Sequence, residues 1–294
     1  MPEVMIGIIG GTGLGEAFSI QTQGEQRLVP TPFGSPSGPI ILSEWSGVRI
    51  ALLARHGEGH LLSPSAVPYR ANIHALKSLG VTHIIASGAV GSLKEAIQPG
   101  HLVVPDQVID KTFRRQSSFF ADHLAVHVEL SHPFCPHLRK LLLECAKEVE
   151  TSVHNGGTYV CMEGPQFSTQ AESRMHQKWG GDLIGMTCMP EAKLAREAQI
   201  CYALVALPSD YDCWREHDPS LSKQELLNEI LANLKQVTDY GTKLIQAAVS
   251  RAGQLADIDC PDRKALELAI WSDKKRIPKK IRRELHLLLG EYLS

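Results

Sequence analysis

Apolar runs alternate with polar, glycine-rich turns along most of the chain. The run at residues 4–9 has the length of a buried strand, and residues 48–54 repeat this pattern. Between residues 68 and 79 the apolar positions fall three and four apart, which predicts a helix, and residues 81–86 form another buried strand. Each strand leads into a polar loop and then a helix, which is typical of an α/β protein.

The alternation continues towards a long helix. We expect further strands at residues 102–110, 157–162, 182–186 and 200–207, and helices near residues 136–149, 169–178 and 190–198. Ser222 and Glu225 have the spacing of a capping box, and an apolar stripe at helical spacing follows from Leu227 to Ala248. A long amphipathic helix therefore begins after Ser222.

Composition separates the end of the chain from the rest. Of the 294 residues, 43% are hydrophobic and 21% are charged, which predicts a globular chain with a large core. After Gly253 the composition changes, and basic residues gather between Lys274 and Arg283. We predict one α/β domain over residues 1–254 and a basic, helical C-terminal extension over residues 255–294.

Charge and hydropathy exclude several kinds of partner. The formal net charge of -2 at pH 7 gives no general field that would attract nucleic acid. We see no run of about 18 apolar residues, so we expect no membrane span. The N-terminus lacks the basic region of a signal peptide. We therefore expect a soluble protein of the cytoplasm.

The cysteines are scattered and odd in number. They are Cys135, Cys145, Cys161, Cys188, Cys201, Cys213 and Cys260. No two of them form a CxxC motif, the spacing that is typical of zinc and redox sites. We predict reduced thiols and no bound metal.

A glycine-rich turn follows the first strand. It contains Gly10, Gly11, Thr12 and Gly13, but it does not meet the GxGxxG pattern of dinucleotide binding, because Gly15 falls one residue early. Two interpretations remain open. The turn can hold a phosphate with its backbone N–H groups, or it can be a tight turn without a ligand.

Two further segments can contribute to an anion site. Arg55 and His56 follow the strand at residues 48–54, and ligands gather at strand ends in open α/β sheets. A guanidinium beside an imidazole can clamp an oxyanion, although a surface ion pair and a loop hydrogen bond are the plainer alternatives. Residues 87–89 form a third small-residue loop after a buried strand, which can present backbone donors to the same anion.

Asp210 and Asp212 form a carboxylate pair after the apolar strand at residues 200–207. Two carboxylates at a strand end can face one ligand, and one of them can exchange a proton with it. The alternative assigns Asp210 to a cap and Asp212 to the surface.

Together these segments resemble the trimeric purine nucleoside phosphorylase family, over about residues 4–250. The motifs that carry the resemblance are IGIIGGTGL (6–14), TPFGSPS (31–37), LLARHG (52–57), IQPG (97–100), PFCP (133–136), MEGPQFST (162–169), MTCMPEAKLAREA (186–198) and SDYDCW (209–214). Within the family, the chain is most similar to the branch that cleaves S-methyl-5'-thioadenosine. The resemblance implies a single α/β domain with a central mixed, partly barrel-like sheet flanked by helices.

The resemblance also implies a role for individual residues. The phosphate site would consist of Thr12, Arg55, His56, Gly88, Ala89 and Thr187. Met186 would pack against the ribose, Asp210 and Asp212 would hold the purine, and Asp210 would donate a proton to purine N7. These groups supply the cation, hydroxyls and backbone N–H groups that anion binding needs.

Four further residues bear on substrate choice. The 6-oxopurine members of the family place a Glu in the segment that holds Ser168 here, and an Asn at the position of Asp210, so this chain is expected to prefer adenine. A carboxylate accepts a hydrogen bond from a 6-amino group but opposes a 6-oxo group. Lys223 stands where the family has an apolar residue near the 5' group, with Leu227 one turn later. His127 matches a segment that approaches the ligand of a neighbouring subunit.

The implied reaction is phosphorolysis of S-methyl-5'-thioadenosine to adenine and 5-methylthioribose 1-phosphate by a homotrimer. Inorganic phosphate would be a co-substrate, and no cofactor is implied. An alternative is a broader purine nucleoside phosphorylase that also uses adenosine or inosine. A non-catalytic nucleoside-binding protein, whose basic extension binds a partner, represents a different class.

Overall fold

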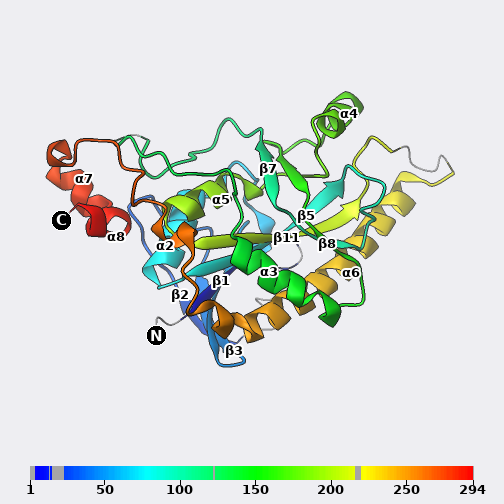
Figure 1. The fold of residues 1–294 in the computed structure, drawn as a ribbon. Helices are drawn as coiled ribbons and strands as arrows, with labels where there is room; N and C mark the ends of the chain where they lie inside the picture. The colour runs from blue at the N-terminus through cyan, green and yellow to red at the C-terminus, as the bar shows by residue number, and fades with distance from the viewer. Residues whose placement is uncertain (1–3, 13, 15–22, 122, 216–219, 294) are drawn as a thin grey trace.

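A computed structural model describes residues 4–12, 14, 23–121, 123–215 and 220–293 of the chain. The described residues contain an eleven-stranded mixed sheet with helices on both faces (Figure 1). The strands are β1 (Met5–Gly10), β2 (Glu25–Arg27), β3 (Ile40–Trp45), β4 (Val48–Ala54), β5 (His83–Ser92), β6 (Leu102–Val104), β7 (Gln107–Asp110), β8 (Val153–Asn155), β9 (Thr158–Cys161), β10 (Leu183–Gly185) and β11 (Cys201–Asp210).

The strand order shows an open sheet that branches at β5. One path runs β2-β3-β4-β1-β5-β10-β9-β7, while β11 pairs with the other edge of β5 and continues through β6 to β8. The helices are α2 (Tyr69–Ser78), α3 (Pro136–Glu144), α4 (Gln170–Lys178), α5 (Cys188–Glu197), α6 (Lys223–Ser250), α7 (Lys279–Glu284) and α8 (His286–Leu289). The predicted α/β architecture, a mixed sheet flanked by helices, is confirmed.

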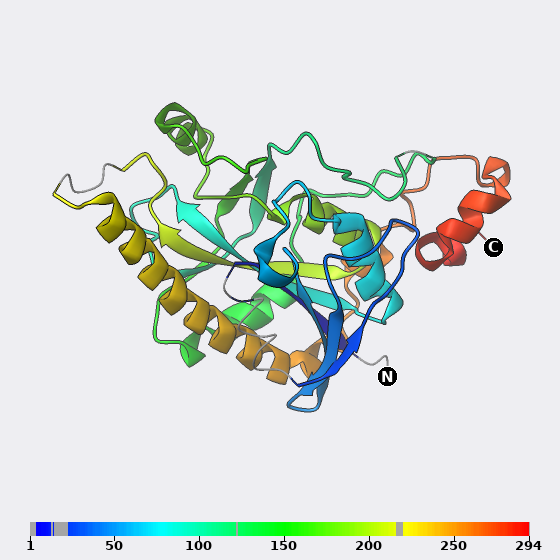
Figure 2. The ribbon, with the colours of Figure 1, turned by 180° about the vertical axis from the view of Figure 1, so that it is seen from behind.

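The side chains of β11 alternate between two core clusters. Tyr202 and Leu204 join the cluster that contains α2 and α5, whereas Ala203 and Val205 join the cluster that contains α3 and α6. Side chains of a strand alternate between the faces of a sheet, so a strand covered on both faces is apolar throughout. Figure 2, which turns the molecule by 180°, shows the length of α6 across its face of the sheet.

The structure corrects several predicted boundaries. The strand expected at residues 81–86 continues to Ser92, because β11 pairs in parallel along it, with Ala206 opposite Gly88 and Leu207 opposite Ala89. Residues 87–89 are therefore part of a strand and not a loop. The strand expected at residues 102–110 divides into β6 and β7, since Pro105 cannot donate to a ladder.

Other elements agree with the pattern or were not anticipated. β4 has the predicted bounds, and α6 begins after Ser222, whose side chain accepts from the backbone of Glu225 in a complete capping box. The strands β2, β3 and β8 were missed. They are short or only partly apolar, so the periodicity of the sequence gave no signal for them.

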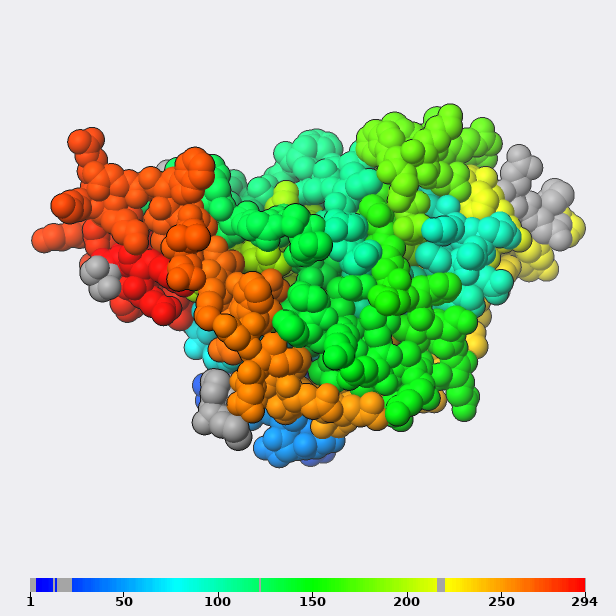
Figure 3. All heavy atoms as spheres, in the orientation of Figure 1, coloured from blue at the N-terminus to red at the C-terminus, as the bar shows by residue number. Residues whose placement is uncertain are grey.

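The C-terminal residues consist of short helical turns that pack on the main core. Leu266, Leu285 and Leu289 are buried in the same cluster as α2 and α5. In Figure 3 the end of the chain covers one end of this face of the molecule. The division of the chain at residue 254 stays a prediction.

Among the described residues, no helix combines the length and the apolar character that crossing a bilayer requires.

Candidate functional site

A cavity opens beside a stretch of β5 that has no neighbouring strand on one edge among the described strands. On this edge β1 pairs with β5 as far as Ala86, and β10 pairs with it only from Gly91. Between these points, residues 87–90 have no partner strand on that side among the described strands. A cavity of about 540 Å³ lies here, which is within the usual size of a small-molecule site.

The cavity collects most of the predicted site residues. They arrive from the end of β1, the end of β4, the middle of β5, the end of β10 and the end of β11. Those that line it are Thr12, Arg55, His56, Gly88, Ala89, Met186, Thr187, Asp210 and Asp212. Residues that are up to 200 positions apart in the sequence meet here, because four strands end beside the unpaired edge of β5.

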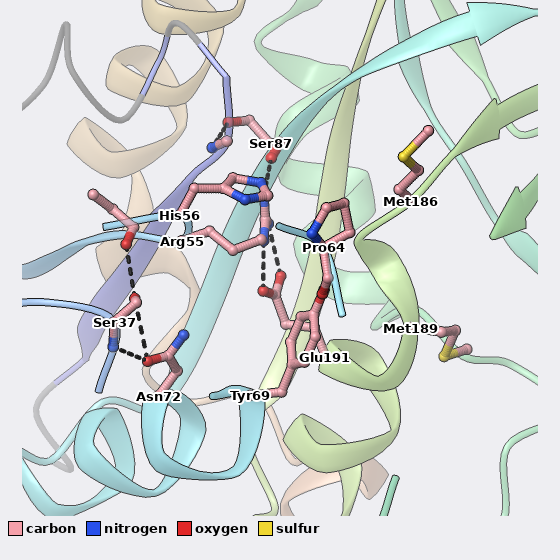
Figure 4. Close-up of polar contacts among 12 residues, drawn as sticks. Ser37, Arg55, His56, Pro64, Tyr69, Asn72, Ser87, Met186, Met189 and Glu191 are labelled. Atoms are coloured by element: carbon pink, nitrogen blue, oxygen red, sulfur yellow. Dashed lines mark hydrogen bonds and ion pairs between the residues drawn. The ribbon is translucent and has the colours of Figure 1, made fainter. Parts of the chain in front are cut away.

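Arg55 lines the cavity, and Figure 4 shows its contacts with Glu191 and Ser87. Its Nε and Nη2 donate to the two carboxylate oxygens of Glu191, both at 2.8 Å, and its Nη1 donates to the carbonyl of Ser87 at 2.8 Å. Burial acts to lower the pKa of Arg55, but the Glu191 carboxylate outweighs burial and holds that pKa above its usual range. A guanidinium has five N–H donors, so these three bonds leave one N–H on Nη1 and one on Nη2.

His56 is neutral at physiological pH. Burial and the nearby Arg55 guanidinium lower its pKa to about 4. Its Nδ1 lies 2.7 Å from the carbonyl of Leu62, which can only accept, so Nδ1 carries the proton and Nε2 carries the lone pair. The ring stacks on His60 with 4.1 Å between centroids. His56 is therefore a fixed hydrogen-bond acceptor rather than a second cation.

The glycine turn after β1 comes unusually close to β5. A Cβ at Gly11 would lie 2.7 Å from the carbonyl oxygen of Ser87 and 2.9 Å from Nη1 of Arg55, so only glycine fits. The backbone of the turn thus packs directly against Ser87 of β5. Gly13 and Gly15 lie outside the described residues.

Thr187 and Gly88 lie next to each other in the lining of the cavity. A Cβ at Gly88 would lie 3.5 Å from the Thr187 hydroxyl oxygen, and that hydroxyl does not cap the following helix α5. With the two remaining donors of Arg55, the anion end of the cavity can therefore present a cation, a hydroxyl and backbone N–H groups to one oxyanion.

The opposite part of the cavity combines carboxylates with an apolar wall. Asp210 accepts a hydrogen bond from the Ser209 hydroxyl at 2.8 Å. Asp212 is buried, and its Oδ2 has no hydrogen-bond partner within the described part of the chain. A buried acceptor without a partner is costly, so this oxygen is suited to a donor on a ligand. The apolar wall includes Met162, Ile184, Met186, Ile230 and Leu234.

Two predicted specificity residues lie beyond the cavity. Lys223 and Leu227 do not line it, whereas Ile230 and Leu234 do. All four positions share one face of α6, because they are separated by four, three and four residues. The first two turns of the helix, held by the capping box at Ser222, extend past the end of the cavity.

Ser168 and His127 also lie outside the lining. Ser168 is adjacent to it, since its carbonyl accepts from the thiol of Cys213, a lining residue, at 3.2 Å. His127 lies elsewhere, in a segment that pairs with the C-terminal residues: its N–H donates to the carbonyl of Ala269 and its ring packs edge-on against Trp271. A role for His127 towards a neighbouring subunit stays a prediction.

Sequence reasoning missed the residues that support Arg55. Glu191 lies within a predicted helix that also contains Glu197 and two basic residues, so nothing in the sequence distinguishes it. Ser37 donates from its hydroxyl to the carbonyl of Ala54 and from its N–H to Asn72, both at 2.8 Å, and so fixes the end of β4 just before Arg55 (Figure 4).

Comparison with known proteins identifies the family. The model of the Phosphorylase superfamily matches residues 5–250. The chain belongs to this superfamily. One relative is the S-methyl-5'-thioadenosine phosphorylase of Geobacter sulfurreducens. It is 45% identical to this chain over 99% of this chain and 100% of its own length. The protein of that name from Aedes aegypti is 45% identical over 83% of this chain and 89% of its own length.

Solved structures agree with this membership. A methylthioadenosine phosphorylase from an antarctic soil metagenomic library superposes with a TM-score of 0.88 at 41% identity, covering 98% of this chain and 100% of its own. The methylthioadenosine phosphorylase from Schistosoma mansoni in complex with tubercidin gives a TM-score of 0.80 at 32% identity, with 98% of each chain covered. This superfamily member therefore has the nucleoside phosphorylase fold over nearly its whole length.

We expect Glu191→Gln to destabilise the protein strongly. The substitution leaves the buried Arg55 charge without its carboxylate, so the free energy of unfolding should fall by about 3 kcal/mol or more. Tyr202→Phe is the matched control, because it removes only the hydroxyl that donates to the same carboxylate at 2.8 Å and should cost about 1 kcal/mol. Urea unfolding measures both. Equal losses would show that the ion pair does not support the site.

The low pKa of His56 predicts a defined pH dependence. As the pH falls from about 6.5, the unfolded chain binds a proton at this imidazole, while the folded protein stays neutral until about pH 4. Stability that depends on His56 is therefore lost as the pH falls through this window. Relative to His56→Gln, which does not titrate, the wild type should lose unfolding free energy between these two pH values. Parallel curves from urea unfolding would contradict a neutral His56.

Proposed function

We propose that this chain catalyses the phosphorolysis of S-methyl-5'-thioadenosine, which makes it a pentosyltransferase. Phosphate attacks C1' of the nucleoside and releases adenine and 5-methylthioribose 1-phosphate. The observation that carries the proposal is one cavity with an anion end, a carboxylate end and an apolar wall between them. The relatives named S-methyl-5'-thioadenosine phosphorylase support it, at 41% to 45% identity. Inorganic phosphate is the co-substrate, and the proposal needs no metal or organic cofactor.

The anion end would position phosphate for attack. The two remaining N–H donors of Arg55, the hydroxyls of Thr12 and Thr187, and the backbone at Gly88 and Ala89 would bind its oxygens. Nε2 of the neutral His56 would accept a hydrogen bond from the O–H of hydrogen phosphate, which turns an unprotonated oxygen towards C1'. A preorganised site of this kind stabilises charge without having to reorganise during the reaction.

The carboxylate end would hold the departing base. When the C1'–N9 bond breaks, its electron pair moves onto the purine, and the ribose develops oxocarbenium charge. Asp210, present as the neutral acid before the step, would donate its proton to N7 and become a carboxylate, which makes adenine a better leaving group. The proton that entered with hydrogen phosphate balances the one that leaves with adenine. The unpartnered Oδ2 of Asp212 would accept a hydrogen bond from the 6-amino group, with Ser168 beside the base.

The apolar wall would select the 5' group. Met186 would cover the ribose, while Ile230 and Leu234 would enclose the methylthio group. A 5'-hydroxyl buried against these side chains would lack a partner, which costs about 1 to 3 kcal/mol. Selectivity for the thioether would then come from Ile230 and Leu234, which lie two to three turns further along α6 than Lys223.

Two wider properties belong to the same proposal. We propose a homotrimer that functions in the cytoplasm, as the family resemblance implies. Large apolar side chains are exposed in the single chain, and a neighbouring subunit that covered them would remove apolar surface from water. Leu61, Phe113 and Phe167 are 86%, 80% and 84% exposed.

The direct test is release of free base from S-methyl-5'-thioadenosine, adenosine and inosine in parallel, with and without phosphate. We expect phosphate-dependent release of adenine, with kcat/KM for the thioether substrate at least about tenfold above that for adenosine. Equal rates with adenosine or inosine would indicate a broader purine nucleoside phosphorylase. Tight binding without turnover would favour a nucleoside-binding protein instead.

Asp210→Asn tests the base end. The amide can donate to a 6-oxo group, so the ratio of kcat/KM for inosine to that for adenosine should rise about tenfold or more. Asp239→Asn makes the same chemical change at an exposed position of α6 and should leave the ratio unchanged. An unaltered ratio in Asp210→Asn would remove Asp210 from base recognition.

A further inference from the structure

Three cysteines and one aspartate that are distant in sequence meet in the interior of the protein. Cys201 begins β11, Cys135 precedes α3, and Cys260 and Asp262 come from the short helical turn at Pro261–Lys264 and the residue before it. One ligand atom from each residue lies within 4.8 Å of all the others, and all four residues are buried. None of them lines the cavity of the candidate active site.

The spacing of these atoms matches a tetrahedral thiolate site. The sulfurs of Cys135 and Cys260 are 3.5 Å apart, and two thiolates on one tetrahedral zinc ion lie about 3.8 Å apart, given a Zn–S distance of about 2.3 Å. A carboxylate oxygen can complete such a site. We propose that Cys135, Cys201, Cys260 and Asp262 bind a structural Zn²⁺ ion.

Surrounding groups suit a site with several anionic ligands. Arg196, itself buried, donates from Nη2 to Oδ1 of Asp262 at 3.0 Å, and it donates to the backbone carbonyls of Glu129 and His132. A carboxylate that ligates a metal is usually oriented by a second partner of this kind. Three thiolates and one carboxylate carry four negative charges, and a zinc ion compensates two of them. The guanidinium of Arg196 offsets part of the charge that remains.

The alternatives explain fewer of the four residues. A disulfide would need its sulfurs about 2.0 Å apart, and any pairing among Cys135, Cys201 and Cys260 would leave one thiol over. Plain apolar packing of three thiols is common, and Arg196 pairs with the Asp262 carboxylate, but neither contact requires one carboxylate oxygen to lie within 4.8 Å of all three sulfurs. A zinc ion uses all four groups.

The proposed ion would join the C-terminal residues to the main sheet. Two ligands come from the phosphorylase core and two from the chain after residue 254. Four protein ligands leave no open position for water, which is typical of a structural rather than a catalytic zinc site. Binding energy at such a site contributes to folding, so the ion would stabilise the attachment of residues 255–294.

The proposal is tested first on the full-length wild-type protein, reduced and purified without chelators. Elemental analysis should find one zinc ion per chain. After removal of zinc, Co²⁺ should produce the thiolate charge-transfer and visible bands of a tetrahedral cobalt site, and added Zn²⁺ should abolish them. A protein that binds neither ion overturns the proposal, as does an intact mass lower by two hydrogens that reductant restores, since that mass indicates a disulfide.

Variants then locate the ion. Cys260→Ser should lose the cobalt bands, and Asp262→Asn, which keeps all three thiols and the size of the side chain, should lower zinc affinity by more than about tenfold. Cys145→Ser replaces a buried cysteine outside the cluster and should keep both the bands and the stoichiometry. Unchanged metal binding in Asp262→Asn and Cys260→Ser would place the ion elsewhere. Metal content is independent of nucleoside turnover, so failure here leaves the proposed function untouched.

Discussion

The central parallel pairing of β5 with β11 is the constraint on which the rest of the structure depends. β11 supports β5 along nearly its whole length, with partners from His83 to Gly91. On the opposite edge of β5, the pairing with β1 can therefore end before the pairing with β10 begins, and β5 still remains one continuous strand. That interruption creates the cavity, and the ends of four further strands deliver their side chains to it.

Burial then determines the electrostatics of the anion end. The Glu191 carboxylate fixes the Arg55 guanidinium in charge and in position, while the same burial keeps His56 neutral. The site thus combines one permanent cation with a neutral acceptor, and neither changes its protonation near neutral pH. A bound oxyanion would meet donors that need no rearrangement, which is the condition for electrostatic preorganisation.

The C-terminal residues belong to the same packed structure. Their apolar side chains complete the cluster formed by α2 and α5, and the backbone of Ile270 pairs with that of Val126 in a β-bridge. The family model ends at residue 250, but the alignment with the Geobacter protein covers 99% of this chain. The extension is thus shared with that relative and is not peculiar to this chain.

The sequence by itself determined the features that depend on neighbours along the chain. The bounds of β4 and the start of α6 follow from an apolar run and from the capping box at Ser222, because periodicity and capping are local interactions. The ordered motifs also predicted the family and nine of the residues that line the cavity.

Only the tertiary structure decided which distant groups meet. The continuation of β5 to Ser92 needed β11 beside it, and Glu191 shows no local sign that its partner is Arg55, 136 residues away. Cys135 and Cys260 are separated by 125 residues, yet their sulfurs are 3.5 Å apart. Spacing along the sequence predicted reduced thiols and no bound metal. The topology of the sheet brings three of these thiols together, since contacts of this range depend on the path of the whole chain.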